Sequence, residues 1–407
     1  MASVNDFTSQ QMYTLALEIY SEATGNKNLD TIDSGDFVSV GQAILKTGYD
    51  PITGAICKVL GRTLFRNRAY SAKFKGLEIS EQKFGAVTRK LYPIDDPAFE
   101  EDERGWDGSL VDDQSVDMYK IHKPKVVSLY WYGEGVLQKK VTLFRDQFDT
   151  AFRSAEDLAA FISMILTEVS NEIELTMESA ARTAIGNLVT GIALSDAAGY
   201  SVGSGNRHIK LITAYNSFFG LTSQDPGYIG TVADAIKNEE FWKWSYAYIG
   251  KKLEMMENKT ELFHTALTGK PMSFHTPKDK MNIYILSDFR RYMDTMAKAS
   301  LYHDSYLKLD GVEEVSFWQS AQTPDSIKNK PTYLKSDGTL VAESNATTIS
   351  NLAMVVFDRD AVGLTRVNQW TGSTPLNVAG GYTNQYYHWT LRYYNSFLEN
   401  AFIVTLD

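Results

Sequence analysis

The sequence has few of the residues that commonly build catalytic or metal centres. Its 407 residues include one cysteine, Cys57, which excludes an internal disulfide and any zinc site made of cysteines. The six histidines show neither a His-Glu-x-x-His motif nor paired metal-ligand spacing. We also expect no nucleophile elbow of the Gly-x-Ser-x-Gly type and no phosphate-binding loop. The sequence therefore predicts no enzyme, no catalytic residues, no metal and no cofactor.

Long apolar runs and excess positive charge are also missing. No run of eighteen apolar residues occurs, and the polar segment Met1–Ser9 lacks the basic and apolar regions of a signal peptide. Forty Lys and Arg stand against fifty Asp and Glu, a formal charge of −10. That balance argues against general nucleic-acid binding, which requires clustered cations. We expect a protein made in a reducing cytoplasm, with no membrane partner.

The most informative feature present is an uninterrupted helical pattern from Ser154 to about Ala193. Ser154 can cap this helix, and Asp157 can complete a capping box. At 1.5 Å per residue the helix is about 60 Å long, several times the average length in globular proteins. A helix of this length is not expected in a compact enzyme. One face is apolar throughout, formed by Leu158, Phe161, Ile162, Ile165, Leu166, Val169, Ile173, Met177, Ala180, Ala184, Leu188 and Val189.

Two oppositely charged segments precede this helix. Residues 58–90 carry nine Lys and Arg against two Glu, and residues 95–117 carry ten Asp and Glu against one Arg. They predict a long protruding hairpin, turning near Pro93–Pro97, that contacts other copies of the chain; a pair of solvated charge runs has equal weight. Exposed ion pairs contribute only about 0 to 1 kcal/mol each, so these charges would set register between copies. The candidate intersubunit residues are Arg62, Arg66, Arg68, Lys73, Lys75, Asp95, Asp96, Glu100, Glu101, Asp102, Glu103, Asp112 and Asp113.

The remaining patterns mix strands and helices, which predicts an α+β fold. A short amphipathic helix, Asp6–Ala23, and a second apolar stretch, Phe37–Leu45, are expected to form an N-terminal arm. Later helices are predicted over Val232–Leu267 and Phe289–Ala299. A type I′ turn at Asp337 and Gly338 is expected between two short strands, 332–334 and 339–342. The other expected strands are Val126–Tyr132 and Leu137–Phe144, paired antiparallel through Gly133–Gly135, and His208–Tyr215, Asn282–Leu286, Val312–Trp318 and Leu352–Phe357.

One pair of carboxylates invites a catalytic interpretation. Asp358 and Asp360 flank Arg359 directly after the strand Leu352–Phe357. They could form an acid pair, but side chains two residues apart diverge if the strand continues, and no nucleophile is nearby. A polar turn at the end of the strand is the favoured interpretation.

The order of these parts resembles the major capsid protein of tailed bacteriophages, the Hong Kong 97 type fold. The segment Met281–Met296, MNIYILSDFRRYMDTM, is similar to the strand, polar turn and helix of that family's axial domain. Leu352–Val367, LAMVVFDRDAVGLTRV, looks like its late strand with an Asp-x-Asp turn. Tyr386–Leu406 resembles the terminal strand that returns to the spine helix. The similarity extends to the head proteins of short-tailed phages of the phi 29 type.

The resemblance implies a domain order for the whole chain. Residues 1–57 would be the N-terminal arm and 58–120 the extended hairpin loop. Residues 121–220 would form the peripheral domain around the spine helix 154–193. Residues 221–380 would form the axial domain, and 381–407 the terminal strand returning to the peripheral domain.

The function implied by the resemblance is self-assembly into hexamers and pentamers of an icosahedral or prolate shell around phage double-stranded DNA. Its expected partners are copies of itself, a scaffolding protein, a portal protein and DNA bound without sequence specificity. The expected location is the virion capsid, after synthesis and assembly in the bacterial host cytoplasm. One alternative is an encapsulin-like nanocompartment shell, which encloses enzyme cargo rather than a genome. Another is a soluble α+β enzyme with an unrecognised site.

Overall fold

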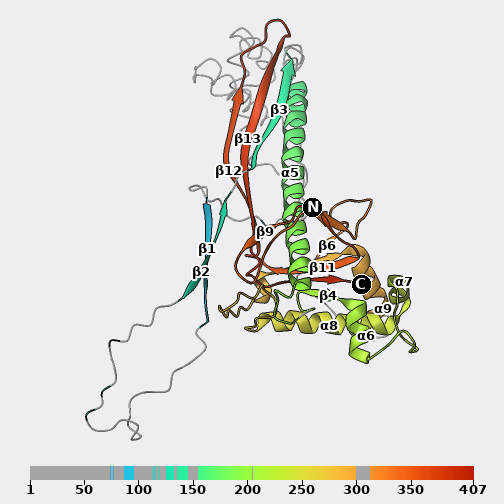
Figure 1. The fold of residues 1–407 in the computed structure, drawn as a ribbon. Helices are drawn as coiled ribbons and strands as arrows, with labels where there is room; N and C mark the ends of the chain where they lie inside the picture. The colour runs from blue at the N-terminus through green and yellow to red at the C-terminus, as the bar shows by residue number, and fades with distance from the viewer. Residues whose placement is uncertain are drawn as a thin grey trace. The chain divides into compact units, whose positions relative to one another are not determined.

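The computed structural model describes residues 87–95, 125–132, 135–144, 155–203, 205–298 and 312–407, and a few single positions before residue 120. The predicted N-terminal arm and most of the two charged segments lie outside these described residues. The turn predicted near Pro93–Pro97 is wrong, because Pro93 is paired antiparallel with Val126 and the Ile94 N–H donates to the Lys125 carbonyl, so the strand pairing continues there. The chain divides into two compact units (Figure 1). The first unit contains residues 1–85, 133–181 and 364–393, and the second contains 86–132, 182–363 and 394–407.

Helix α5, Ala155–Ala197, confirms the predicted long helix with 43 residues (Figure 1). Its C-terminal end forms a Schellman motif. The backbone N–H of Tyr200 donates to the Ser195 carbonyl at 2.9 Å, and that of Gly199 donates to the Asp196 carbonyl at 3.1 Å. Gly199 has a φ of 75°, the left-handed conformation that this motif requires and that glycine adopts without a steric cost.

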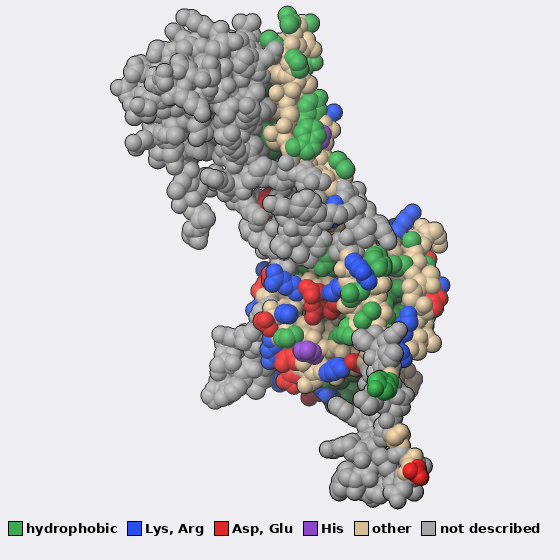
Figure 2. Space-filling model, turned by 90° about the vertical axis from the view of Figure 1, so that its left-hand side faces the viewer, with side chains coloured by type: hydrophobic (Ala, Val, Ile, Leu, Met, Phe, Trp, Pro, Cys, Tyr) green, Lys and Arg blue, Asp and Glu red, His purple; other side chains and the backbone are tan. Residues whose placement is uncertain are grey.

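In the first unit, a three-stranded sheet packs on α5. Its order is β12–β13–β3, and β13 pairs antiparallel with β3, so that Tyr382 lies opposite Phe144. Met177 of α5 is buried with Leu364 and Leu391 of the sheet. Figure 2 shows that hydrophobic side chains outnumber charged ones on the visible described part of this unit. The strands are β3 (Gly135–Phe144), β12 (Val362–Ser373) and β13 (Tyr382–Asn395).

The second unit is built on a five-stranded mixed sheet in the order β4–β14–β11–β5–β6. All seven residues of the central strand β11 are buried, as expected for a continuous apolar run covered on both faces. The expected strand Asn282–Leu286 is confirmed as β5, and the expected hairpin near Gly338 as β8 and β9. The strands are β4 (His208–Lys210), β5 (Met281–Leu286), β6 (Val312–Val315), β11 (Leu352–Asp358) and β14 (Ala401–Thr405).

Helices and smaller strand pairs complete the second unit. Helices α6 and α9 each pack against α8. The helices are α6 (Leu211–Phe219), α7 (Val232–Lys237), α8 (Glu239–Glu257) and α9 (Ser287–Lys298), with a 3-10 turn at Lys278–Lys280. The paired short strands are β7 (Ile327–Asn329) with β10 (Thr347–Ile349), β8 (Thr332–Leu334) with β9 (Leu340–Ala342), and β1 (Val87–Pro93) with β2 (Val126–Tyr132).

The predicted pairing of Val126–Tyr132 with Leu137–Phe144 is wrong. Both segments are strands, but β2 pairs with β1 and β3 pairs with β13. A connection of two or three residues favours a hairpin, yet it constrains only the local path of the chain. The partner of β3 is a strand remote in sequence, β13.

Several other element boundaries also differ from expectation. The strand predicted over His208–Tyr215 ends at Lys210, because Leu211, Ile212 and Tyr215 are buried on one side of helix α6. The helical block Val232–Leu267 is interrupted at Asn238, whose Oδ1 accepts from the Phe241 N–H and caps α8.

Three further corrections concern strands and a turn. The strand Val312–Trp318 ends at Val315, and the terminal segment Tyr386–Leu406 is divided between β13 and β14. The turn between β8 and β9 is not type I′. Gly338 has a φ of 87°, but Asp337 is not among the described non-glycine residues with positive φ, and type I′ requires both.

We predict that Gly191→Ala destabilises the chain by about 1 to 3 kcal/mol. A Cβ at Gly191 of α5 would lie 2.6 Å from the Phe397 ring, so a packed core would have to shift. The control is Gly250→Ala in α8, where a Cβ meets no atom within 4 Å and helix propensity improves. Thermal unfolding monitored by circular dichroism checks this. Equal or higher midpoints for both variants would contradict the packing described.

Candidate functional site at the base of the β1–β2 ribbon

Strands β1 and β2 form a two-stranded ribbon, called the β1–β2 ribbon below. Its antiparallel register runs from Val87 opposite Tyr132 to Pro93 opposite Val126. An isolated two-stranded ribbon is marginally stable in water, so its stability depends on contacts with the rest of the unit. Alternate side chains point to opposite faces of a strand, and one face of this ribbon, containing Lys90, Tyr92 and Trp131, carries those contacts.

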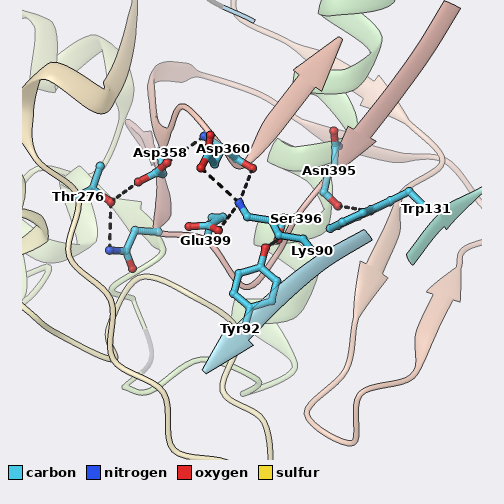
Figure 3. Close-up of polar contacts among 10 residues, drawn as sticks. Lys90, Tyr92, Trp131, Thr276, Asp358, Asp360, Asn395, Ser396 and Glu399 are labelled. Atoms are coloured by element: carbon cyan, nitrogen blue, oxygen red, sulfur yellow. Dashed lines mark hydrogen bonds and ion pairs between the residues drawn. The ribbon is translucent and has the colours of Figure 1, made fainter. Parts of the chain in front are cut away.

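Lys90 makes the charged contact (Figure 3). Its Nζ forms an ion pair with the Glu399 carboxylate and lies 3.7 Å from Asp360 Oδ2. It also donates to the backbone carbonyl of Asp360 at 3.3 Å. The two carboxylates differ in environment, because the side chain of Glu399 is 13% exposed and that of Asp360 is 64% exposed. The ammonium therefore joins β1 to one buried and one solvated acceptor.

Tyr92 supplies the buried part of the same face. Its Oη lies 2.5 Å from Ser396 Oγ, and its ring packs edge-on against Phe274 with centroids 5.8 Å apart. The Lys90 Nζ also lies 5.4 Å from the centre of the Tyr92 ring. Burial raises the pKa of the Tyr92 hydroxyl above its usual range, so this group stays neutral.

Trp131 anchors the second strand of the ribbon (Figure 3). Its Nε1–H donates to the Asn395 carbonyl at 2.9 Å, and its ring lies against Tyr394 with centroids 5.1 Å apart. The Asn395 side chain in turn donates from Nδ2 to the Ala184 carbonyl of α5 at 2.8 Å. The ribbon is thereby connected to α5 through two consecutive hydrogen bonds.

The Asp358 and Asp360 pair forms a polar turn, which confirms the favoured interpretation of these carboxylates. Asp358 Oδ1 accepts from the backbone N–H of Asp360 at 2.9 Å, and Oδ2 accepts from the Thr276 hydroxyl at 2.7 Å (Figure 3). The turn holds Asp360 where Lys90 meets both its carbonyl and its carboxylate. These two carboxylates serve a structural contact between chain segments.

Asp95, directly after β1, is also held by its own chain. Its Oδ1 accepts from Lys259 Nζ at 2.8 Å and its Oδ2 from the Ser273 hydroxyl at 2.6 Å. These two hydrogen bonds hold the pKa of Asp95 below its ordinary value. The backbone N–H of Asp95 donates to the Pro271 carbonyl. The exit of the ribbon toward the acidic segment is therefore fixed.

The structure describes two of the thirteen predicted intersubunit residues. Asp95 is in the contacts above, and Asp113 is exposed with a left-handed φ of 71°. The contact of Asp95 with another copy stays a prediction. The other eleven lie outside the described residues: Arg62, Arg66, Arg68, Lys73, Lys75, Asp96, Glu100, Glu101, Asp102, Glu103 and Asp112.

Sequence reasoning missed the residues that hold the ribbon. Lys90 had been counted only as part of a basic run, and Glu399 had not been singled out. Alternation along β1 was the available signal, since Tyr92 is buried between the exposed Leu91 and Pro93. Their partners lie more than 260 residues away, beyond the reach of any local pattern.

The described residues give weaker support to three other kinds of site: a metal site, a membrane-spanning helix and a nucleophile elbow. Within the described part of the chain, no group of three His, Cys, Asp or Glu side chains is placed to hold a metal ion, and no helix is long and apolar enough to cross a membrane. Residues 199–203 read Gly-Tyr-Ser-Val-Gly, the letters of a nucleophile elbow. The elbow geometry is missing, because the segment follows helix α5 and precedes strand β4, whereas an elbow joins a strand to a helix.

We predict that Glu399→Gln flattens the pH dependence of stability. Burial raises the pKa of Glu399 above its ordinary 4.5, against the opposing effect of Lys90. A carboxyl whose native pKa is raised stabilises the fold fully below its ordinary pKa, and this contribution is lost as the pH rises through the raised value. Between pH 5 and 7.5 the unmodified chain should therefore lose more stability than the variant. Unfolding midpoints across this range check it; Asp360→Asn, which keeps Glu399, is the control, and parallel profiles would refute the assignment.

Comparisons with solved structures identify the fold. A chain of the capsid structure of Staphylococcus phage Andhra matches with a TM-score of 0.53 and 12% identity, covering 84% of this chain and 86% of that one. A chain from the structure of the head fiber and inner core protein gp22 of bacteriophage P68 matches with a TM-score of 0.52 and 12% identity, covering 83% and 86%. At this identity the likeness shows the fold, and it confirms the expected Hong Kong 97 type capsid fold with mixed helix and sheet.

Comparison with sequences gives the family. No curated protein sequence matches the chain. The family model described as Phi29-like phage major capsid protein matches residues 17–405, nearly the whole chain. The chain belongs to the Phi29-like phage major capsid protein family.

Proposed function

We propose that the copies of this chain form the hexamers and pentamers of an icosahedral or prolate shell around double-stranded DNA. As a member of its family, the chain is a structural protein of phage capsid shells. We further propose that it assembles on a scaffolding protein, joins a portal protein, and is made in the bacterial host cytoplasm. The single observation that carries the assembly role is the β1–β2 ribbon, which is anchored on one face and exposed and apolar on the other.

The exposed face of the ribbon supports this role. Leu91 is 52% exposed, Val126 is 56% exposed and Tyr130 is 41% exposed. Arg89 lies opposite Tyr130, with its guanidinium carbon 5.3 Å from the ring centre. Aromatic and arginine side chains are enriched where proteins contact each other, and an apolar face on a two-stranded ribbon gains stability when a partner covers it. A neighbouring copy is the partner that a shell supplies.

The charged segments flanking the ribbon support the same assignment. They carry opposite net charge, and the ends at which they meet, Lys90 and Asp95, are held on the second unit by Glu399 and Lys259. Subunits in a ring meet through two different surfaces, which extended segments can provide. The charges set register between copies and speed their encounter more than they strengthen the finished contact.

The net charge of the chain affects how the proposed shell would hold its DNA. The chain carries −10, and DNA is a polyanion, so a shell lined by this chain would not hold DNA tightly. Figure 2 shows Lys and Arg mixed with Asp and Glu over the visible side of the second unit, with no large field of one sign. Weak, sequence-independent contact suits DNA that is packed into a shell. A nanocompartment would instead enclose enzyme cargo, so particles with a genome and a portal distinguish the two.

We predict that Leu91→Glu combined with Val126→Glu abolishes shells while leaving the subunit folded. Both side chains are exposed on the same ribbon face, so the free energy of unfolding should change by less than about 0.5 kcal/mol each. New carboxylates would have to be desolvated at the contact between copies. Negative-stain microscopy and sedimentation velocity measure assembly, with circular dichroism for folding. The matched control is Leu340→Glu, which changes an exposed leucine on β9. Normal shells from the double variant would contradict the proposal.

We also predict that reversing Arg66 and Arg68 to Glu blocks particle formation. Both arginines lie outside the described residues, in the basic segment proposed to meet the acidic segment of another copy. Charge reversal places like charges together, which disfavours encounter. Light scattering during assembly should show no particles, with folded subunits retained in solution. Unchanged assembly would show that the basic segment is not part of the interface between copies.

A further inference from the structure

Arg207 is a fully buried charged residue near the end of α5. Its exposed fraction is 0%, and it directly precedes strand β4. Its Nη1 donates to Thr265 Oγ1 at 2.9 Å and to Ser195 Oγ at 3.4 Å. Its Nε and Nη2 are buried without a hydrogen-bond partner. A guanidinium with unmet donors in the interior is costly, so these two groups require acceptors.

Two buried acceptors in the same region are unpartnered as well. Asp196 is 7% exposed; its Oδ2 accepts from the Gly205 N–H at 3.0 Å, and its Oδ1 has no partner. The Ser201 hydroxyl is buried without a partner, and Ser201 forms a backbone bridge with Thr265, which accepts from Arg207. The segments that carry two unmet donors and two unmet acceptors are thus joined through Thr265 and through Ser195, the neighbour of Asp196.

The electrostatics indicate that Arg207 and Asp196 act on each other without touching. Burial lowers the pKa of Arg207 to about 10, and the Asp196 carboxylate opposes that shift. The two side chains nevertheless make no direct ion pair within 4 Å, so their charges interact across a gap. The last turn of α5 contains no basic residue of its own. Arg207 is therefore positioned to complement the partial negative charge at the carbonyl end of this helix.

We propose that Arg207, Asp196 and Ser201 form a site for one buried water molecule that bridges the two charges. A water molecule accepts two hydrogen bonds and donates two. It accepts from Nε and Nη2 of Arg207 and donates to Asp196 Oδ1 and to the Ser201 hydroxyl. Buried waters in globular proteins make two to four such bonds to otherwise unsatisfied groups. This single water satisfies all four atoms.

The bridged pair joins chain segments that are far apart in sequence. Asp196 is in the last turn of α5, Ser201 is in the loop after it, and Thr265 lies beyond α8. The carbonyl of Arg207 accepts from the Ile403 N–H at 2.7 Å, which adds strand β14. The water site thereby connects the end of the long helix to the edge of the five-stranded sheet. Its role is structural and is independent of the ribbon contact between copies.

The direct test is a high-resolution map of the assembled shell, together with nuclear magnetic resonance of the unassembled chain. The map should show an isolated density peak within about 3.2 Å of Arg207 Nε, Arg207 Nη2 and Asp196 Oδ1. The Arg207 Hε resonance, assigned by its disappearance in Arg207→Lys, should show a cross-relaxation signal to long-lived water. A direct Arg207–Asp196 ion pair with no intervening density would overturn the proposal.

A mutant cycle provides a second test that remains informative if one variant folds poorly. Arg207→Met and Asp196→Asn each leave one buried polar group uncompensated, so each should lower the unfolding midpoint by about 5 °C or more. The double variant should lose clearly less than the sum of the two losses. The exposed pair Glu239 and Lys243 is the control, with small and additive losses. Additive losses at Arg207 and Asp196 would contradict the bridge.

Discussion

The structure depends on covering the apolar side of α5. A helix of this length is not held by backbone hydrogen bonds alone, because helices in water gain most of their stability from tertiary packing. In the first unit, Met177 packs against leucines of the β12–β13–β3 sheet. In the second unit, Gly191 lets the Phe397 ring approach the helix backbone more closely than any larger residue would allow. The capped end of α5 then continues directly into the loop that carries Arg207.

Residues 394–400, which comprise the last two residues of β13 and the connection to β14, join the ribbon, the helix and the sheet of the second unit. Asn395 accepts from Trp131 of the ribbon and donates to Ala184 of α5. Glu399 forms an ion pair with Lys90. The Asn400 carbonyl accepts from the Asp358 N–H at the end of β11. Residues 394–400 therefore hold a ribbon that begins before residue 90.

The contacts at the base of the ribbon are structural. The charged cluster at Lys90 holds one chain segment of the second unit against another. What remains exposed on the ribbon is apolar and aromatic, which is the surface that a neighbouring copy would cover. The chain belongs to the Phi29-like phage major capsid protein family, whose members assemble into shells through contacts between copies.

Local sequence patterns determined the parts of the fold whose signal lies within a few residues. Helical spacing predicted α5 to within four residues of its end, continuous apolar runs predicted β5 and β11, and the Asp358–Asp360 turn was recognised from its position after a strand. The order of these parts also indicated the family. The local pattern wrongly extended a strand to Tyr215, whereas residues Leu211–Phe219 form helix α6, which packs against α8.

Only the tertiary structure decided which segments meet. The sequence favoured β2 with β3, because they are adjacent, whereas β2 pairs with β1 and β3 with β13. It marked Lys90 as one cation in a basic run and could not identify Glu399, 309 residues later, as its partner. Periodicity reports which face of an element is buried, since it reflects geometry along one segment. The partner that covers this face is selected by packing and charge across the whole folded chain, which no local pattern contains.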